Sequence, residues 1–163
     1  MDSNTSIHNF AQVARDFCHW AETAPLNPSD DITKGLLLLP KLYTVALQLP
    51  PASRSDTEYP ALSSEELRPV MRRFAELPDA DYSAFCDPFV FPPVETYVGW
   101  ISDELADIYR DLKEGFSAYE ANQLEDAAWI WKFQFKYHWG EHLVNVQWAL
   151  HRRAVDKYLW PDF

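Results

Sequence analysis

Two histidines four residues apart, in the C-terminal quarter of the chain, are the side chains best placed for chemistry. His138, Glu141 and His142 spell H-x-x-E-H, the order found in inverzincin peptidases. On one continuous helix, residues i and i+4 share a face, so both imidazoles could bind one metal ion with a carboxylate close by. A hydrolytic zinc site also needs a third protein ligand and an open position for water. The acidic helix that precedes this segment could supply the third ligand from Asp103, Glu104, Asp107 or Asp111.

The same histidines also fit a purely structural role. Polar residues recur at intervals of 4, 3, 4, 7 and 4 and form one stripe, bordered by His142: Gln134, His138, Glu141, Asn145, Arg152 and Asp156. Because the rest of the helix is apolar and rich in Trp, the stripe must reach solvent or be satisfied by internal hydrogen bonds. We expect this internal network, with a neutral His138 bonded to a carboxylate or a backbone carbonyl and no need to converge on His142. Gly140, inside the same helix, indicates the close approach of another helix or ring.

Acidic residues are concentrated in one segment of the chain. The net charge is −11, and residues 76–126 carry thirteen acids against two bases, so this segment accounts for the whole excess. On the expected helix of this segment, the polar face carries Asp103, Glu104, Asp107, Asp111 and Glu114. A solvated face is one interpretation, and a docking surface for a basic partner is the other.

These charges lead to a first hypothesis for the function. Clustered Lys and Arg are needed for phosphate contacts, so direct nucleic-acid binding is not expected. The first hypothesis is a non-enzymatic binding protein whose acidic 76–126 segment engages a basic macromolecule, for example an immunity-type protein that masks a basic nuclease. The alternative is a metal-binding protein or metal-dependent hydrolase that uses His138 and His142, completed by Asp107 or Asp111.

Several other classes of site are excluded by motif. With only four glycines, the sequence has no G-x-G-x-x-G, no phosphate-binding P-loop and no G-x-S-x-G, and it implies no cofactor. It contains no E-x-x-H, which excludes a ferritin-like di-iron site. Cys18 and Cys86 make no disulfide framework, which favours a reducing compartment. No secretory signal and no apolar run of bilayer length are visible, so we expect a cytoplasmic protein without a membrane partner.

The periodicity predicts helices throughout. The expected helices cover about residues 3–23, 29–49, 63–77, 97–119 and 124–159, and Gly140 is a place where the last helix could bend. Pro40 should kink or split the second helix, and Ser63-x-x-Glu66 should cap the third. Residues 79–95 are expected to form one helical turn and then extended chain, because no alternating strand pattern is visible. The prediction is a single all-α domain over residues 1–163, a bundle of about five helices. Its long, Trp-rich C-terminal helix should be central and antiparallel to the helix before it.

Three segments of this bundle resemble one bacterial family. They are LYTVALQLP from Leu42, ISDELADIYRDLKEGFSAYEA from Ile101, and WIWKFQFKYHWGEHLVNVQWALH from Trp129. The sequence is similar in order, over roughly residues 5–153, to the family known as domain of unknown function 5063. The resemblance implies a helical, cytoplasmic protein. It implies no activity and no catalytic residue, because the family has none assigned.

Overall fold

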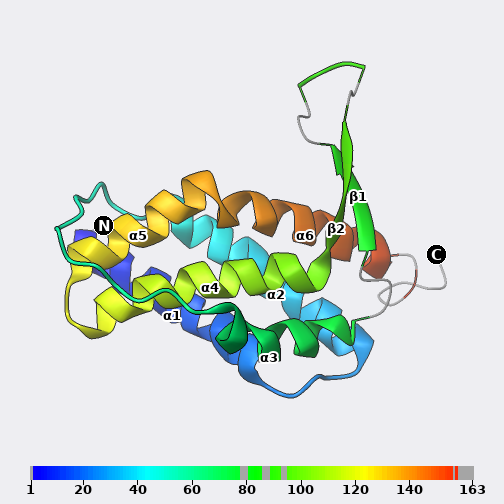
Figure 1. Ribbon diagram of the computed structural model, residues 1–163, viewed down its shortest axis with the longest axis horizontal. Coiled ribbons are helices and arrows are strands. Elements are labelled where there is room, and N and C mark those ends of the chain that lie inside the picture. Colours follow the sequence, from blue (N-terminus) through cyan, green and yellow to red (C-terminus); the bar gives the residue numbers. More distant parts are fainter. Residues whose placement is uncertain (1, 78–80, 86–88, 93–94, 156, 158–163) are drawn as a thin grey trace.

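The computed structural model describes residues 2–77, 81–85, 89–92, 95–155 and 157. Within these residues the chain forms six α-helices and one two-stranded hairpin (Figure 1). The helices are α1 (Ser3–Glu22), α2 (Pro28–Leu47), α3 (Ser64–Ala75), α4 (Ile101–Glu120), α5 (Leu124–Tyr137) and α6 (Trp139–Ala154); the strands are β1 (Asp81–Phe85) and β2 (Thr96–Trp100). The predicted helical bundle is confirmed. None of the described helices is long and apolar enough to cross a bilayer.

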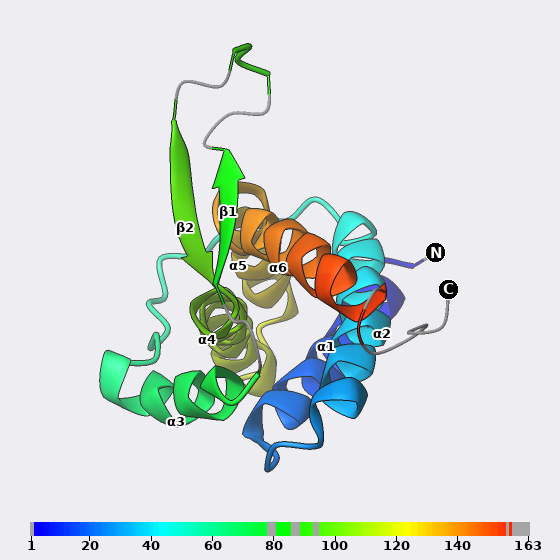
Figure 2. The ribbon, with the colours of Figure 1, turned by 90° about the vertical axis from the view of Figure 1, so that its right-hand side faces the viewer.

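Helix α4 is the element around which the bundle is arranged. It packs against α1, α3, α5 and α6, and Figure 2 shows α3 below it, α5 and α6 above it and α1 to its right, while the hairpin stands out from the bundle. The segment 124–159, predicted to be central, packs against both α4 and α2 and buries Trp131 and Trp139 completely. One side of α5 and α6 faces solvent, because Phe133, Tyr137, Val144 and Trp148 are exposed.

Large aromatic rings fill the interior, as expected for a sequence of 163 residues with seven Trp. Trp131 and Trp139 are both fully buried. The ring of Trp131 lies 4.7 Å from that of Phe10, and its indole N–H donates to the carbonyl of Leu112 on α4 at 3.0 Å. A Cβ at Gly115 would come within 2.1 Å of the Trp131 indole nitrogen, so only glycine allows α4 and α5 to approach this closely. Packing of these rings supplies much of the apolar burial that stabilises the fold.

Two helix signals in the sequence have different outcomes. Ser63 and Glu66 form a reciprocal capping box at the start of α3, as predicted, which satisfies amides that the first turn leaves unpaired. Helix α2 continues through Pro40 as one helix, so of the two outcomes expected at Pro40, a kink or a split, the split does not occur.

The hairpin corrects the prediction for residues 79–95. Strands β1 and β2 are antiparallel, with Tyr82 opposite Gly99. Their alternation is hidden in the sequence because Val98 and Trp100, on the outward side of β2, are apolar although 55% and 52% exposed. The inward side carries Tyr82 and Tyr97, which are partly buried. A pattern of apolar-in and polar-out residues is therefore absent, and with it the usual signature of a strand.

Replacing Trp139 by Ala tests the assignment of the core. The side chain is fully buried and its indole N–H bonds to the Trp131 carbonyl at 3.1 Å, so the cavity should cost about 3–5 kcal/mol in the free energy of unfolding. Asp103→Ala, at an exposed position, should change it by less than about 0.5 kcal/mol. Urea denaturation measures both, and equally mild effects would contradict the assignment.

Candidate metal centre

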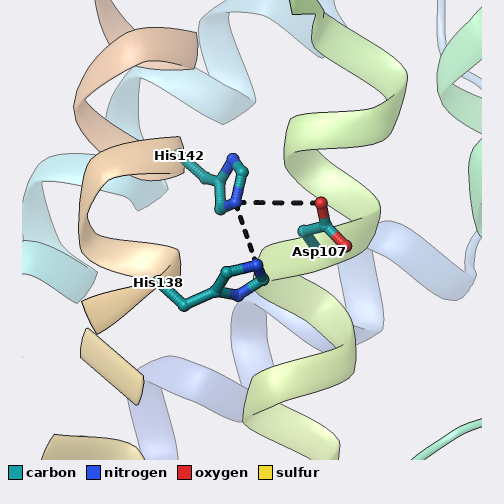
Figure 3. Close-up of side chains that lie close together, drawn as sticks. All are labelled: Asp107, His138 and His142. Atoms are coloured by element: carbon teal, nitrogen blue, oxygen red, sulfur yellow. Dashed lines mark hydrogen bonds and ion pairs between the residues drawn. The ribbon is translucent and has the colours of Figure 1, made fainter. Parts of the chain in front are cut away.

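His138 and His142 face each other next to α4, and Asp107 of α4 points toward them (Figure 3). The two Nε2 atoms are 3.2 Å apart. The Oδ2 atom of Asp107 lies 3.8 Å from Nε2 of His142. One ligand atom from each of the three residues lies within 4.8 Å of the other two. Within the described part of the chain, this is the one group of histidine, cysteine and acidic side chains with the spacing to hold a metal ion.

A break in the C-terminal helical segment places His138 in this arrangement. Residues expected to form one helix from 124 to 159 form α5 and α6 instead, and His138 lies between them with φ −146° and ψ −88°. Gly140 makes the break possible, because a Cβ there would lie 2.2 Å from the carbonyl oxygen of Phe135. The close approach predicted at Gly140 therefore exists, and the approaching group is the backbone of α5.

Each of the three side chains is held by a partner on its other polar atom. Nδ1 of His138 lies 2.6 Å from Oδ2 of Asp111, and Nδ1 of His142 lies 2.5 Å from Oε2 of Glu104. Nη2 of Arg110 lies 2.8 Å from Oδ1 of Asp107, which leaves Oδ2 of that carboxylate for the histidine side. Carboxylates that bond the second nitrogen of a histidine are a regular feature of metal sites, since they fix the tautomer and the ring.

These contacts decide which atoms face each other. An ionised carboxylate only accepts hydrogen bonds, so Nδ1 of each histidine carries the hydrogen. In the neutral rings both Nε2 atoms are then acceptors, and two lone pairs meet at 3.2 Å. A positive group between them, a proton or a metal cation, removes this repulsion. Ligand atoms about 2.0–2.1 Å from a tetrahedral zinc ion are about 3.3 Å apart, close to the observed separation of the imidazoles.

The acidic surroundings favour a positive group at this place. Burial alone would lower the pKa of His142, but the hydrogen bond and charge of Glu104, with the charges of Asp107 and Asp111, raise it above its ordinary value. Burial raises the pKa of Asp111, while the bond to His138 opposes this shift. The carboxylates around His142 thus favour its positively charged form, so the site attracts cations.

The structural network predicted from the sequence is also present. His138 bonds a carboxylate of the preceding helix, as expected. Further along the stripe, Gln134 donates to Glu114 at 3.3 Å and Asn145 donates to the Tyr97 hydroxyl at 2.8 Å. The two histidines also converge, which the network did not require, so the network supports a ligand set and does not exclude one.

Other residues of the stripe lie elsewhere. Glu141 and Arg152 are exposed, and Glu141 is not in the group formed by the two histidines and Asp107. The carboxylate of the H-x-x-E-H pattern therefore does not accompany its histidines. Asp156 lies outside the described residues.

The acidic face of α4 differs from the expectation of a solvent-facing surface. Glu104 and Asp111 are only 5% and 3% exposed, because they face the histidines. Glu114 is partly buried beside Gln134, and Asp103 is the exposed member of the set. The α4 carboxylates predicted to act together on a partner are thus divided between the site and the solvent.

Two residues of the site were not singled out from the sequence. Arg110 follows Asp107 at i+3, a spacing that places both on one face and could have indicated their ion pair. The Tyr82 hydroxyl donates to Oε1 of Glu104, and no sequence signal predicts this contact, since it depends on the unforeseen hairpin.

A cysteine nucleophile is not supported. Burial raises the pKa of the Cys18 thiol to about 12, so the reactive thiolate is scarce at neutral pH. Cys86 lies outside the described residues.

Comparison with known proteins identifies the family of the chain. Residues 2–156 match the family described as Domain of unknown function (DUF5063). The chain belongs to this DUF5063 family. Protein BF1032 from Bacteroides fragilis, whose crystal structure is known, is similar to it with 28% identity and a TM-score of 0.73, over 90% of each chain. No curated protein gives a significant match. The DUF5063 resemblance in the sequence is thus confirmed, and the family description assigns no activity.

Gly140→Ala tests the break that positions His138. On helix propensity alone, alanine should stabilise a helix by about 1 kcal/mol. Here its Cβ would meet the Phe135 carbonyl, so we expect a loss of about 1–3 kcal/mol in the free energy of unfolding. Urea denaturation gives the sign, and a stabilised variant would show that α5 and α6 form one continuous helix.

Proposed function

We propose that this DUF5063 protein binds one divalent transition-metal ion through Nε2 of His138, Nε2 of His142 and Oδ2 of Asp107. The observation that carries the proposal is that every ligand has its second polar atom fixed: by Asp111, by Glu104 and by Arg110, respectively. A hydrogen-bonded core histidine needs one partner for each ring. It does not need two rings whose free nitrogens meet beside a third, oriented carboxylate.

The ligand types favour particular metals. Two imidazoles and one carboxylate suit zinc, and the same set in a facial arrangement suits ferrous iron. Magnesium and calcium prefer an all-oxygen environment, so they fit poorly. Zinc is a suitable first probe, because its tetrahedral ligand spacing of about 3.3 Å is close to the separation of the two Nε2 atoms.

Three protein ligands leave a coordination position open. The side chains of His138, His142 and Asp107 are 35%, 26% and 20% exposed, so solvent reaches the group. A metal bound with an open position can polarise a ligand or lower the pKa of bound water. The arrangement therefore supports a site that binds water or a small ligand, in preference to a closed structural site.

The alternative of a basic macromolecular partner has less geometric support. It depends on an exposed acidic face, and two of the carboxylates expected there, Glu104 and Asp111, are buried against the histidines. These two carboxylates bond His138 and His142 and are not available to a partner at the surface. The remaining acidic residues of segment 76–126 keep a basic partner as a proposal of second rank.

Thermal unfolding with and without zinc tests the proposed site. Zinc at about 100 times its Kd should stabilise the wild type by about 2.7 kcal/mol, a rise of about 5–10 °C in Tm for a chain of this size. His138→Gln keeps a hydrogen-bonding side chain and should cost about 1 kcal/mol without metal, but it should abolish the rise. His151→Gln changes an exposed histidine of helix α6 and should keep the rise.

Two results would overturn the metal site. One is a wild type whose Tm does not respond to zinc. The other is untagged protein, purified without chelators, that holds less than stoichiometric zinc, iron, manganese and nickel together. Either result would leave a proton between the two imidazoles as the positive group.

A further inference from the structure

We infer that the β-hairpin is coupled to metal occupancy through the Tyr82–Glu104–His142 chain of hydrogen bonds, so that binding of the ion and docking of the hairpin onto the bundle strengthen each other. This inference rests on the proposed metal site and adds a positioning residue and a conformational response to it.

Glu104 is the link between the two elements. Its Oε2 holds Nδ1 of His142 at 2.5 Å, and its Oε1 accepts the hydroxyl hydrogen of Tyr82 from strand β1. The carboxylate is only 5% exposed, so water competes little for either oxygen. The hairpin therefore supplies one of the two bonds that orient the carboxylate behind a ligand of the metal.

The hairpin is built to deliver this hydroxyl. Tyr82 lies opposite Gly99 in the register, and a Cβ at Gly99 would come within 2.5 Å of the Tyr82 ring. Only glycine lets the ring cross the partner strand toward α4. Burial and the bond to Glu104 raise the pKa of Tyr82 above its ordinary value, so the phenol stays protonated and donates.

Side chains of both strands contact the bundle, and the bond of Tyr82 is one of these contacts. A two-stranded hairpin is at best marginally stable by itself. Besides the Tyr82–Glu104 bond, Asn145 of α6 donates to the Tyr97 hydroxyl, and the Tyr82 ring meets the Trp148 ring edge-on with centroids 6.5 Å apart. Strengthening or loosening the bond to Glu104 should therefore change how firmly β1 and β2 lie on the bundle.

A metal ion would act on this bond through His142. Coordination at Nε2 makes the Nδ1–H a stronger donor and fixes the ring, which in turn fixes Glu104. Coupling between two binding events is reciprocal, so any factor by which Tyr82 strengthens metal binding is the factor by which the metal strengthens docking of Tyr82.

Tyr82→Phe tests the inference with Tyr109→Phe as its matched control. Tyr109 also donates to a carboxylate, Glu22 at 2.7 Å, but outside the histidine group. Removal of a group that bonds a metal ligand directly typically weakens metal binding about 10–100-fold. Tyr82 acts one bond further out, through Glu104, so its loss should have a smaller effect. We expect a zinc Kd weaker by about 3–10-fold in Tyr82→Phe, measured by competition with a chromophoric chelator, and a Kd unchanged within about twofold in Tyr109→Phe.

Hydrogen exchange of the hairpin amides separates this coupling from a purely structural role of Tyr82, because a purely structural role would not make the exchange depend on zinc. Zinc should slow exchange of the amides in β1 and β2 several-fold in the wild type and in Tyr109→Phe, and should leave their exchange unchanged in Tyr82→Phe. Two results would overturn the inference and leave the metal site standing. One is an equal zinc Kd in the wild type, Tyr82→Phe and Tyr109→Phe. The other is a wild type that binds zinc without any change in the exchange of the hairpin amides. A wild type that binds no zinc would overturn both.

Discussion

The contact between the Trp131 indole and Gly115 sets the distance between α4 and the C-terminal helices. The glycine has no side chain in the way of the ring, and the indole N–H locks onto the Leu112 carbonyl one turn earlier. From this anchor the antiparallel helices bring together Glu114 with Gln134, Asp111 with His138 and Glu104 with His142. The polar pairs depend on the anchor because a hydrogen bond tolerates only a few tenths of an ångström.

The charge of the site follows from this packing. Buried carboxylates are costly unless they are paired, and α4 buries Glu104 and Asp111 against the imidazoles of His142 and His138. The arrangement is best balanced when a further positive charge lies between the Nε2 atoms. This preference for a positive charge connects the acidic segment 76–126 with His138 and His142. It also explains why part of the acidic excess lies inside the protein.

The site is not a property of one helix. His138 lies at the junction of α5 and α6, Asp107 and Glu104 come from α4, and Tyr82 comes from the hairpin that precedes α4. The bonds of Asp111 to His138, of Glu104 to His142 and of Tyr82 to Glu104 each join different elements. The reach of the hairpin depends on Gly99 as the reach of α5 depends on Gly115. Three of the four glycines thus mark places where two backbones or a ring and a backbone meet.

The sequence by itself determined the helical class, the capping box at Ser63 and the aromatic core, because these depend on local periodicity and on residue type. It also indicated His138 and His142 as candidate ligands, but it left the third ligand open between Asp107 and Asp111. It could not determine the hairpin, since outward Val98 and Trp100 hide its alternation, nor the break at His138, which needs the Phe135 carbonyl beside Gly140. It also could not decide which acids of α4 face solvent. Only the tertiary structure decided that, because helix rotation is fixed by the packing of Trp131 and Trp139, and that rotation aims Glu104, Asp107 and Asp111 at the histidines.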